Sequence, residues 1–280
     1  MRPIIALLTD FGSTDWLVGS MKVVILSRVA DCAIVDLCHT IEPGAVGQAA
    51  WLLERTFRDF PPSTVFCTVV DPGVGTGRRA IAALGTVAEP QAGSLRHQRY
   101  FFVAPDNGLL TGVRRHVQNW RCCAITNAGW MRSEVSQTFH GRDIFAPAAA
   151  QIALEGGIEN AGEPIADPVE IEPPGATPAA NGSIEGTIIL FDRFGNAIST
   201  IARNTLGGAT RDRAWRVVLG DLTVEPVSST FADVAPGEAV AYWGSLGTLE
   251  IAIRNGNARE RLGLHLGQRI SLRPILDVQA

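Results

Sequence analysis

The 280-residue sequence has few cysteines and no long apolar run. Its five cysteines, an odd number without paired spacing, exclude a disulfide framework and are typical of free thiols, which favours a cytoplasmic protein. No apolar stretch approaches the roughly 18–20 residues that span a bilayer. The apolar stretch at residues 3–8 is too short for the core of a signal peptide. We therefore expect neither a membrane span nor a secretory signal.

The sequence also lacks an excess of charge of one sign. Its 24 Lys and Arg and 28 Asp and Glu leave a net charge of −4 at pH 7, and the basic residues are scattered. Without a basic stripe, nucleic acid is not expected as the main partner. His and Cys do not occur at zinc-ligand spacing, so no metal site is expected. The class that remains is small-molecule chemistry.

A phosphate-binding loop is excluded as well. The glycine-rich residues 71–79 lack Gly-Lys-Ser/Thr and lead into the strand-like residues 80–84 instead of a helix, so no helix dipole points at a phosphate. The glycines are expected to let the backbone pass close to a bound ligand while Asp71 and Arg78 face the same space. A purely structural ion pair is the alternative.

The first half of the chain alternates short apolar runs with helical patterns, which is typical of βα units and a mostly parallel sheet. The expected strands are residues 3–8, 33–37, 64–70 and 100–104, and the expected helices are residues 16–29, 45–57 and 142–154. The polar residues 89–99 are expected to form an exposed loop. We predict an α/β N-terminal domain over residues 1–163.

The second half has a different composition. Residues 164–181 are rich in Pro, Ala, Gly and Glu and predict a linker. Beyond it, short β-rich runs alternate with turn residues, as in a small antiparallel barrel or sandwich. These runs are residues 187–191, 215–219, 239–243, 249–253 and 269–272. We predict a smaller C-terminal antiparallel β-barrel domain over residues 182–280.

Three expected strands run into an acid that is closely followed by glycine: Asp10, Asp71 and Asp106. In open α/β sheets ligands bind outside the carboxyl ends of the strands, so these acids are expected to converge on one crevice. Ordinary turn chemistry is the alternative for any one of them.

His140 lies just ahead of the third helix and before Gly141. An unperturbed pKa near 6.5 makes histidine the natural proton acceptor at neutral pH. His39, at the end of a strand, competes for this role, and a histidine that merely completes a turn is the alternative. Together, His140, Asp71 and Arg78 supply a base, an anion and a cation, the minimum set for making water nucleophilic without a metal.

At these residues the chain resembles the S-adenosylmethionine hydroxide adenosyltransferase family, also called S-adenosylmethionine hydrolases, which are relatives of fluorinase and chlorinase. The resemblance covers most of both domains. Its motifs are Thr9-Asp10-Phe11-Gly12, Gly19-Ser20-Met21-Lys22, Val70-Asp71-Pro72-Gly73-Val74-Gly75, Pro105-Asp106-Asn107-Gly108, Thr138-Phe139-His140-Gly141-Arg142-Asp143-Ile144-Phe145-Ala146-Pro147, Asp192-Arg193-Phe194-Gly195-Asn196 and Leu249-Glu250-Ile251-Ala252.

The resemblance implies hydrolysis of S-adenosylmethionine, as substrate and not cofactor, to adenosine and L-methionine, with water attacking ribose C5′. It implies a homotrimer whose sites lie between subunits. The implied catalytic residues are Asp71, Arg78 and His140; the implied substrate-binding residues are Asp10 for the ribose hydroxyls, Asp192 for the ammonium, Ser245 for the carboxylate, and Asn196, Phe231 and Asn255 at the adenine end.

The chain departs from the halogenating relatives at three positions. The first two argue against halide as the nucleophile, and the third alters the carboxylate end of the pocket. Asp71 replaces an aromatic hydroxyl and Gly141 replaces a serine. Leu246 replaces the arginine that follows the carboxylate-binding serine. A halide-dependent adenosyltransferase and a sensor that binds S-adenosylmethionine or adenosine without turnover are the alternative functions.

Overall fold

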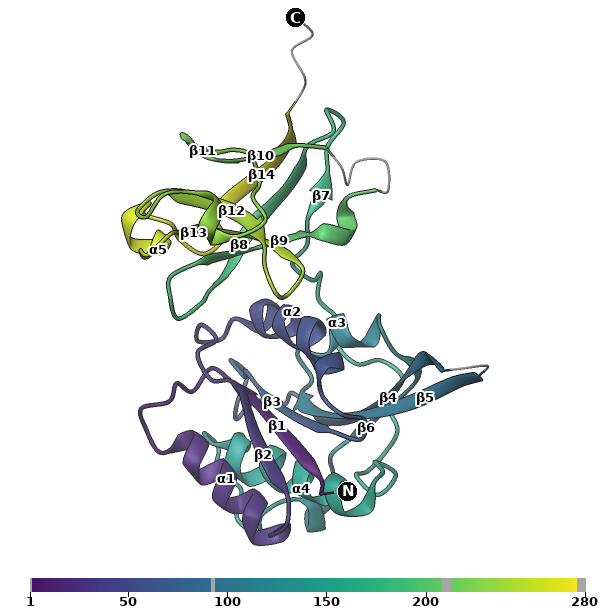
Figure 1. The fold of residues 1–280 in the computed structure, drawn as a ribbon. Coiled ribbons are helices and arrows are strands. Elements are labelled where there is room, and N and C mark those ends of the chain that lie inside the picture. Colours follow the sequence, from purple (N-terminus) through teal and green to yellow (C-terminus); the bar gives the residue numbers. More distant parts are fainter. Residues whose placement is uncertain (1, 92–93, 208–212, 276–280) are drawn as a thin grey trace, which may run out of the picture. The chain divides into compact units, whose positions relative to one another are not determined.

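The computed structural model describes residues 2–91, 94–207 and 213–275. The chain divides into two compact units, Met1–Pro173 and Pro174–Ala280. Each unit has its own sheet and its own hydrophobic core (Figure 1).

The first unit is built on a six-stranded sheet in the order β2-β1-β3-β5-β4-β6. The four strands β2, β1, β3 and β5 are parallel to their neighbours in that run, whereas β4 is antiparallel to both β5 and β6. The strands are β1 (Ile4–Thr9), β2 (Ala33–Cys38), β3 (Val65–Val69), β4 (Ala80–Gln91), β5 (Ser94–Pro105) and β6 (Gln118–Ala124). The predicted mostly parallel α/β domain is confirmed.

Helices cover both faces of this sheet (Figure 1). Helix α1 (Leu17–Arg28) and helix α4 (Ala146–Glu155) pack together on one face, and α2 (Val46–Thr56) lies with the short α3 (Thr111–Arg114) on the other. Because side chains alternate along a strand, Ile5 and Leu7 enter the core under α1 and α4. On the opposite face Phe66 stacks on Phe102 at 5.4 Å between ring centroids.

Helix α4 ends where its sequence predicts, but it begins at Ala146 and not at the predicted residue 142. It is preceded by one π-helical turn, Gly141–Phe145, whose N-cap is His140. It ends at Gly156, which has a left-handed φ of 68° that glycine adopts at little cost. His140 therefore lies directly ahead of a helical segment. Single π-helical turns inside longer helices are frequent at functional sites.

The register of the parallel strands explains why two of the acids share one edge of the sheet. Thr9, the last residue of β1, pairs with Val69, the last residue of β3. Asp10 and Asp71 follow within two residues of this pair, so the chain delivers both carboxylates to the carboxyl end of adjacent strands.

Residues 89–91 and 94–99 do not form the predicted loop, and residues 92 and 93 of that prediction lie outside the described part of the chain. The described residues belong to β4 and β5, which pair as an antiparallel ladder with Glu89 opposite Arg96 and Ala88 opposite His97. These four side chains include exposed polar groups, as their composition indicated. The ladder itself depends on backbone hydrogen bonds, which leave no signal in side-chain polarity, and this is why the prediction of a loop was wrong.

The second unit is a barrel of antiparallel strands in the order β11-β10-β14-β8-β9-β13-β12, with β7 added beside β8. Strands β11 and β12, at the two ends of this order, contact each other, so the barrel is nearly closed. The strands are β7 (Thr177–Pro178), β8 (Ile184–Phe191), β9 (Ala197–Ala202), β10 (Trp215–Leu219), β11 (Leu222–Val224), β12 (Ala239–Trp243), β13 (Thr248–Ile253) and β14 (Arg269–Pro274). This confirms the predicted antiparallel barrel.

Alternation along β13 separates the barrel core from its outer face. Leu249, Ile251 and Ile253 belong to the core of the barrel. Glu250 and Ala252 therefore point the other way, where Ala252 packs with Tyr242 in a small second cluster.

Within the described residues, no helix is long and apolar enough to cross a membrane. In the same part of the chain, no three His, Cys, Asp or Glu side chains gather closely enough to hold a metal ion.

Candidate active site

A cavity of about 310 Å³ opens at the carboxyl end of β1 and β3 in the first unit. Two carboxylates, one imidazole and two aromatic rings are among the groups that line it. The lining residues are Asp10, Phe11, Leu17, Val69, Asp71, Val74, Thr138, Phe139, His140 and Gly141.

Asp71, Arg78 and His140 form one connected group at this cavity. Arg78 Nε lies 2.9 Å from each carboxylate oxygen of Asp71, and Arg78 Nη2 donates a further hydrogen bond to Asp71 Oδ2. Arg78 Nη2 also lies 2.7 Å from Nδ1 of His140. The guanidinium is packed over the ring of Phe145 at 5.1 Å. The structure thus brings together the three residues that the sequence singled out.

The direction of the hydrogen bond between Arg78 and His140 fixes the tautomer of the neutral imidazole. A guanidinium can only donate, so His140 Nδ1 must accept, and the ring proton then lies on Nε2. Burial and the charge of Arg78 lower the pKa of His140, against the smaller opposing effects of Asp71 and Asp143. His140 is therefore neutral at pH 7, with one N–H to offer.

This lowered pKa predicts where activity is lost in acid. Because neutral His140 accepts from Arg78, we expect kcat/KM to hold steady as the pH falls to about 6.5, the ordinary pKa of histidine, and to decline only below it. A pH–rate profile, with an NMR titration of the His140 ring, measures this. Half-maximal activity reached above pH 6.5 on the acid side would contradict the expected neutral imidazole.

Asp10 lies on the same cavity and is anchored by the backbone. Its Oδ2 accepts from the N–H of Gly44 at 2.8 Å. Burial raises the pKa of Asp10; the Gly44 N–H opposes this, and the nearby charge of Asp71 adds to it. The third acid does not join them: Asp106 accepts from Arg79 Nε at 2.7 Å and from the Val169 N–H at 2.7 Å. The prediction that all three acids converge therefore fails at Asp106, because an ion pair and the following chain engage it elsewhere.

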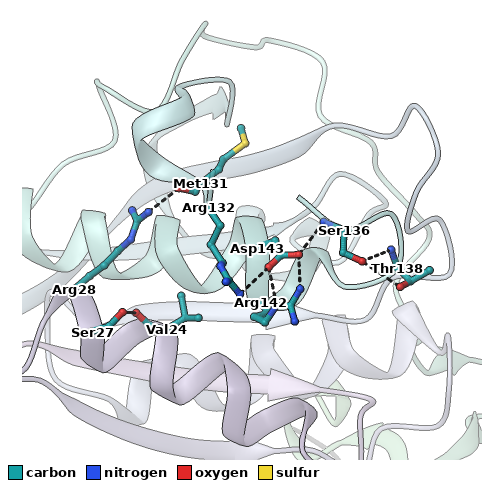
Figure 2. A network of polar contacts seen from close by, with 9 residues as sticks. All are labelled: Val24, Ser27, Arg28, Met131, Arg132, Ser136, Thr138, Arg142 and Asp143. Carbon is teal, nitrogen blue, oxygen red and sulfur yellow. Dashed lines mark hydrogen bonds and ion pairs between the residues drawn. The ribbon is translucent and has the colours of Figure 1, made fainter. Parts of the chain in front are cut away.

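The loop that leads into His140 is held by a buried carboxylate (Figure 2). Asp143 is fully buried and accepts from Arg142 Nε at 2.7 Å, from Arg132 Nη1 at 3.4 Å and from the Ser136 N–H at 2.9 Å. Ser136 Oγ in turn accepts from the Thr138 N–H at 3.2 Å. Thr138 lines the cavity, so this network sets the course of the chain up to His140.

Replacing Asp143 with Asn should destabilise the fold. Burial alone would raise the pKa of Asp143, but Arg142, the Ser136 N–H and Arg132 outweigh burial and lower it. The charged form thus contributes stability that is present above the ordinary pKa of aspartate and lost as the pH falls through the lower folded value. Since both arginines are partly exposed, we expect a loss of about 2 kcal/mol at pH 7.

Denaturant unfolding of wild type and the D143N variant, repeated at falling pH, measures this. The difference should shrink towards zero in acid. Asp31→Asn is the control, because Asp31 is 93% exposed in its pair with Arg2 and should change stability little. An equal loss in both variants, or a gap that widens in acid, would contradict the role given to Asp143.

The glycine-rich segment after β3 touches the same loop. Gly75 has a φ of 77°, and a Cβ atom there would lie 2.5 Å from the backbone oxygen of Gln137. The close approach that this glycine permits is therefore to the chain just before Thr138. The sequence analysis expected a ligand close to these glycines; at Gly75 the close neighbour is protein backbone.

The second unit carries the other predicted site residues. Asp192 accepts from the Phe194 and Asn196 N–H groups and from the Asn196 side chain, at 2.7–2.9 Å. Phe231 is 41% exposed and lies 4.4 Å from the Tyr242 ring. Ser245 is exposed in the turn between β12 and β13.

Asn255 is also exposed and lies two residues beyond β13, with a left-handed φ of 58°. Among the second-unit predictions, the structure joins Asp192 and Asn196 by a direct contact.

Sequence reasoning missed Glu250 as a candidate. It is only 7% exposed, and Tyr242 Oη donates to its Oε2 at 2.6 Å. Burial raises the pKa of Glu250; the Tyr242 hydrogen bond opposes this, and Asp192 adds to it. A carboxyl group buried on the outer face of a barrel is unusual. Two sequence signals could have revealed it: the acid interrupts the apolar run of β13, and it lies in the motif Leu249-Glu250-Ile251-Ala252 that the chain shares with the family.

Comparison with protein families assigns both units. A family model described as the SAM hydroxide adenosyltransferase N-terminal domain matches residues 5–162, and one described as the SAM hydroxide adenosyltransferase C-terminal domain matches residues 186–271. This chain belongs to the SAM hydroxide adenosyltransferase family. Every predicted site residue of this family member lies within the matched ranges.

The similarity to known proteins covers nearly the whole of this chain. An (R)-S-adenosyl-L-methionine hydrolase from Thermus thermophilus is 39% identical, covering 97% of this chain and all of that protein. A fluorinase from Actinopolyspora mzabensis is 32% identical over 90% of each chain. The crystal structure of an uncharacterized conserved protein from Thermotoga maritima matches with a TM-score of 0.82 and 33% identity, over 96% of this chain and 99% of that one.

Proposed function

We propose that this protein hydrolyses S-adenosyl-L-methionine to adenosine and L-methionine. The observation that carries the proposal is the connected Asp71–Arg78–His140 group on a cavity that also presents Asp10. Family membership and the hydrolase from Thermus thermophilus support the same reaction.

The difficult part of this reaction is the activation of the nucleophile, water. The substrate is a sulfonium, so its sulfur leaves as a neutral thioether and needs no protonation. Water must be held in line with the ribose C5′–S bond and must lose a proton as its oxygen bonds to C5′. Positioning both partners supplies several kcal/mol of the barrier, and a general base adds a factor of about 10²–10⁴.

The hydrogen-bond directions support a division of roles in the trio. His140 Nδ1 already accepts from Arg78, which leaves Nε2–H to donate to the oxygen of the attacking water. The carboxylate of Asp71 is then the group that accepts the proton. Arg78 fixes both partners and stabilises negative charge as hydroxide develops.

The remaining predicted residues are proposed to bind substrate. Asp10 binds the ribose hydroxyls, Asp192 binds the ammonium group of the methionine part, and Ser245 binds its carboxylate. The adenine end of the substrate contacts Asn196, Phe231 and Asn255. We further propose a homotrimer in which the first unit of one subunit and the second unit of its neighbour complete each site. Sedimentation that shows a monomer with full activity would refute the shared site.

Hydrolysis in oxygen-18 water tests the reaction. The expected result is one labelled oxygen at the 5′ position of adenosine and none in methionine, by mass spectrometry of the products. Adenosine without label, or no methionine after prolonged incubation, would reject water attack at C5′. Ligand that copurifies without turnover would instead favour the sensor.

Halide transfer is the second candidate, because fluorinases match this chain over 90% of its length. Product analysis with and without chloride separates the two reactions. Adenosine alone under both conditions supports hydrolysis. Formation of 5′-chloro-5′-deoxyadenosine that grows with chloride would establish halide transfer.

A further inference from the structure

His39 is a buried histidine outside the trio, directly after β2. It does not appear among the residues that line the cavity. Its Nδ1 lies 2.9 Å from Thr9 Oγ1, and its backbone oxygen accepts from the N–H of Gly12 at 2.7 Å. His39 therefore contacts the chain on both sides of Asp10.

The proton positions in this contact follow from the donors available. Thr9 Oγ1 accepts from the Phe11 N–H at 3.2 Å, so its own hydrogen is free to point at His39 Nδ1. Neutral His39 then carries its proton on Nε2, which lies 3.0 Å from Asp36 Oδ1. Nε2 has no well-aligned hydrogen bond, so the contact with Thr9 is the better formed of the two.

The same connection between β2 and α2 holds the Asp10 carboxylate itself. Gly44 donates to Asp10 Oδ2, and Gly44 and His39 both belong to the segment that joins these elements. One Asp10 oxygen is thus fixed by the backbone, and the strand end that carries Asp10 is fixed through Thr9. A carboxylate so held can present its second oxygen in one direction, which is the condition for selective binding of a neighbouring pair of hydroxyls.

We propose that His39 is a positioning residue: through the Thr9 hydroxyl it aims Asp10 at the ribose hydroxyls and so sets selectivity for a ribonucleoside. The inference rests on the proposed function for the identity of the ligand. It gives the second histidine of the sequence a role different from proton transfer.

Two substitutions distinguish the contact of His39 Nδ1 with Thr9 from the contact of Nε2 with Asp36. In His39→Asn the amide oxygen replaces Nδ1 and still accepts from Thr9, whereas in His39→Gln the amide reaches the Nε2 position and keeps only the contact with Asp36. Calorimetry measures binding of adenosine and of 2′-deoxyadenosine to each full-length variant. Wild type should prefer adenosine by about 10-fold or more, since a hydrogen bond to a charged group is lost in the deoxy ligand.

The expected result is that H39N keeps this preference and H39Q loses most of it. Thr9→Val should lose the preference for adenosine as H39Q does, whereas Thr9→Ser, which keeps the hydroxyl, should keep it. The Thr9→Val/His39→Gln double variant should lose no more of the preference than either single variant. In turnover, KM for S-adenosylmethionine should rise about 10-fold in H39Q while kcat changes little.

An unchanged adenosine preference in folded H39Q or Thr9→Val protein would overturn the proposal, as would equal losses in H39N and H39Q. The binding measurement needs no turnover. If wild type binds adenosine selectively but forms no methionine, the proposed reaction fails while the role of His39 stands.

Discussion

Replacing Asp71 with Asn is expected to lower kcat by about 10²–10⁴-fold. In the proposed mechanism Asp71 accepts the proton of the attacking water, which Asn cannot do. Asn also leaves Arg78, only 11% exposed, without the charge that both carboxylate oxygens now supply. Steady-state kinetics with S-adenosylmethionine measure the loss, and calorimetry with adenosine should show that nucleoside binding largely survives.

The control for this substitution is Asp167→Asn. Asp167 also pairs with an arginine, Arg79, at 2.9 Å, but it is 82% exposed and lies outside the lining of the cavity. It should keep wild-type turnover, because exposed ion pairs contribute little. If D71N retained more than a tenth of the wild-type kcat, Asp71 could not be the proton acceptor.

Gly75→Ala is expected to reduce turnover by about 100-fold without removing any catalytic group. The new Cβ would lie 2.5 Å from the Gln137 oxygen, and a φ of 77° is itself unfavourable for alanine by about 1–2 kcal/mol. The segment from Asp71 to Arg78 must then move away from the loop that carries Thr138 and leads to His140. A displacement of about 1 Å between catalytic groups can cost a factor of 10².

Gly77→Ala is the matched control in the same segment. A Cβ at Gly77 meets nothing within 4 Å, so stability and turnover should stay close to wild type. Kinetics and thermal unfolding of both variants test the pair. Equal behaviour of the two alanine variants would show that the contact between Gly75 and Gln137 does not hold the site together.

Much of the fold follows from local patterns in the sequence. The apolar runs that became β1, β2 and β3 are short and bounded by turn residues, and helix α4 stops at Gly156 because glycine adopts the left-handed conformation at little cost. Strand β6 escaped detection, since Gln118–Ala124 mixes polar residues, Trp and Cys in no clear alternation.

The candidate site was predictable to the extent that it depends on strand ends. Asp10 and Asp71 follow parallel neighbours, so their meeting at one edge could be expected from the sequence. The same reasoning gave the wrong result for Asp106. Its strand, β5, also lies in the sheet, but Arg79 and the backbone of Val169 engage its carboxylate, and neither partner could be assigned from a pattern.

The sequence by itself determined the class of each domain and offered Asp71, Arg78 and His140 as a chemical set. Only the tertiary structure decided that Arg78 donates to His140 Nδ1, that Gly75 abuts the backbone of Gln137, and that His39 contacts Thr9 instead of the cavity. The reason is physical: periodicity and turn chemistry act over a few neighbouring residues. Hydrogen-bond direction between residues that lie 30 to 62 positions apart is set by strand register and by the packing of the helices on the sheet.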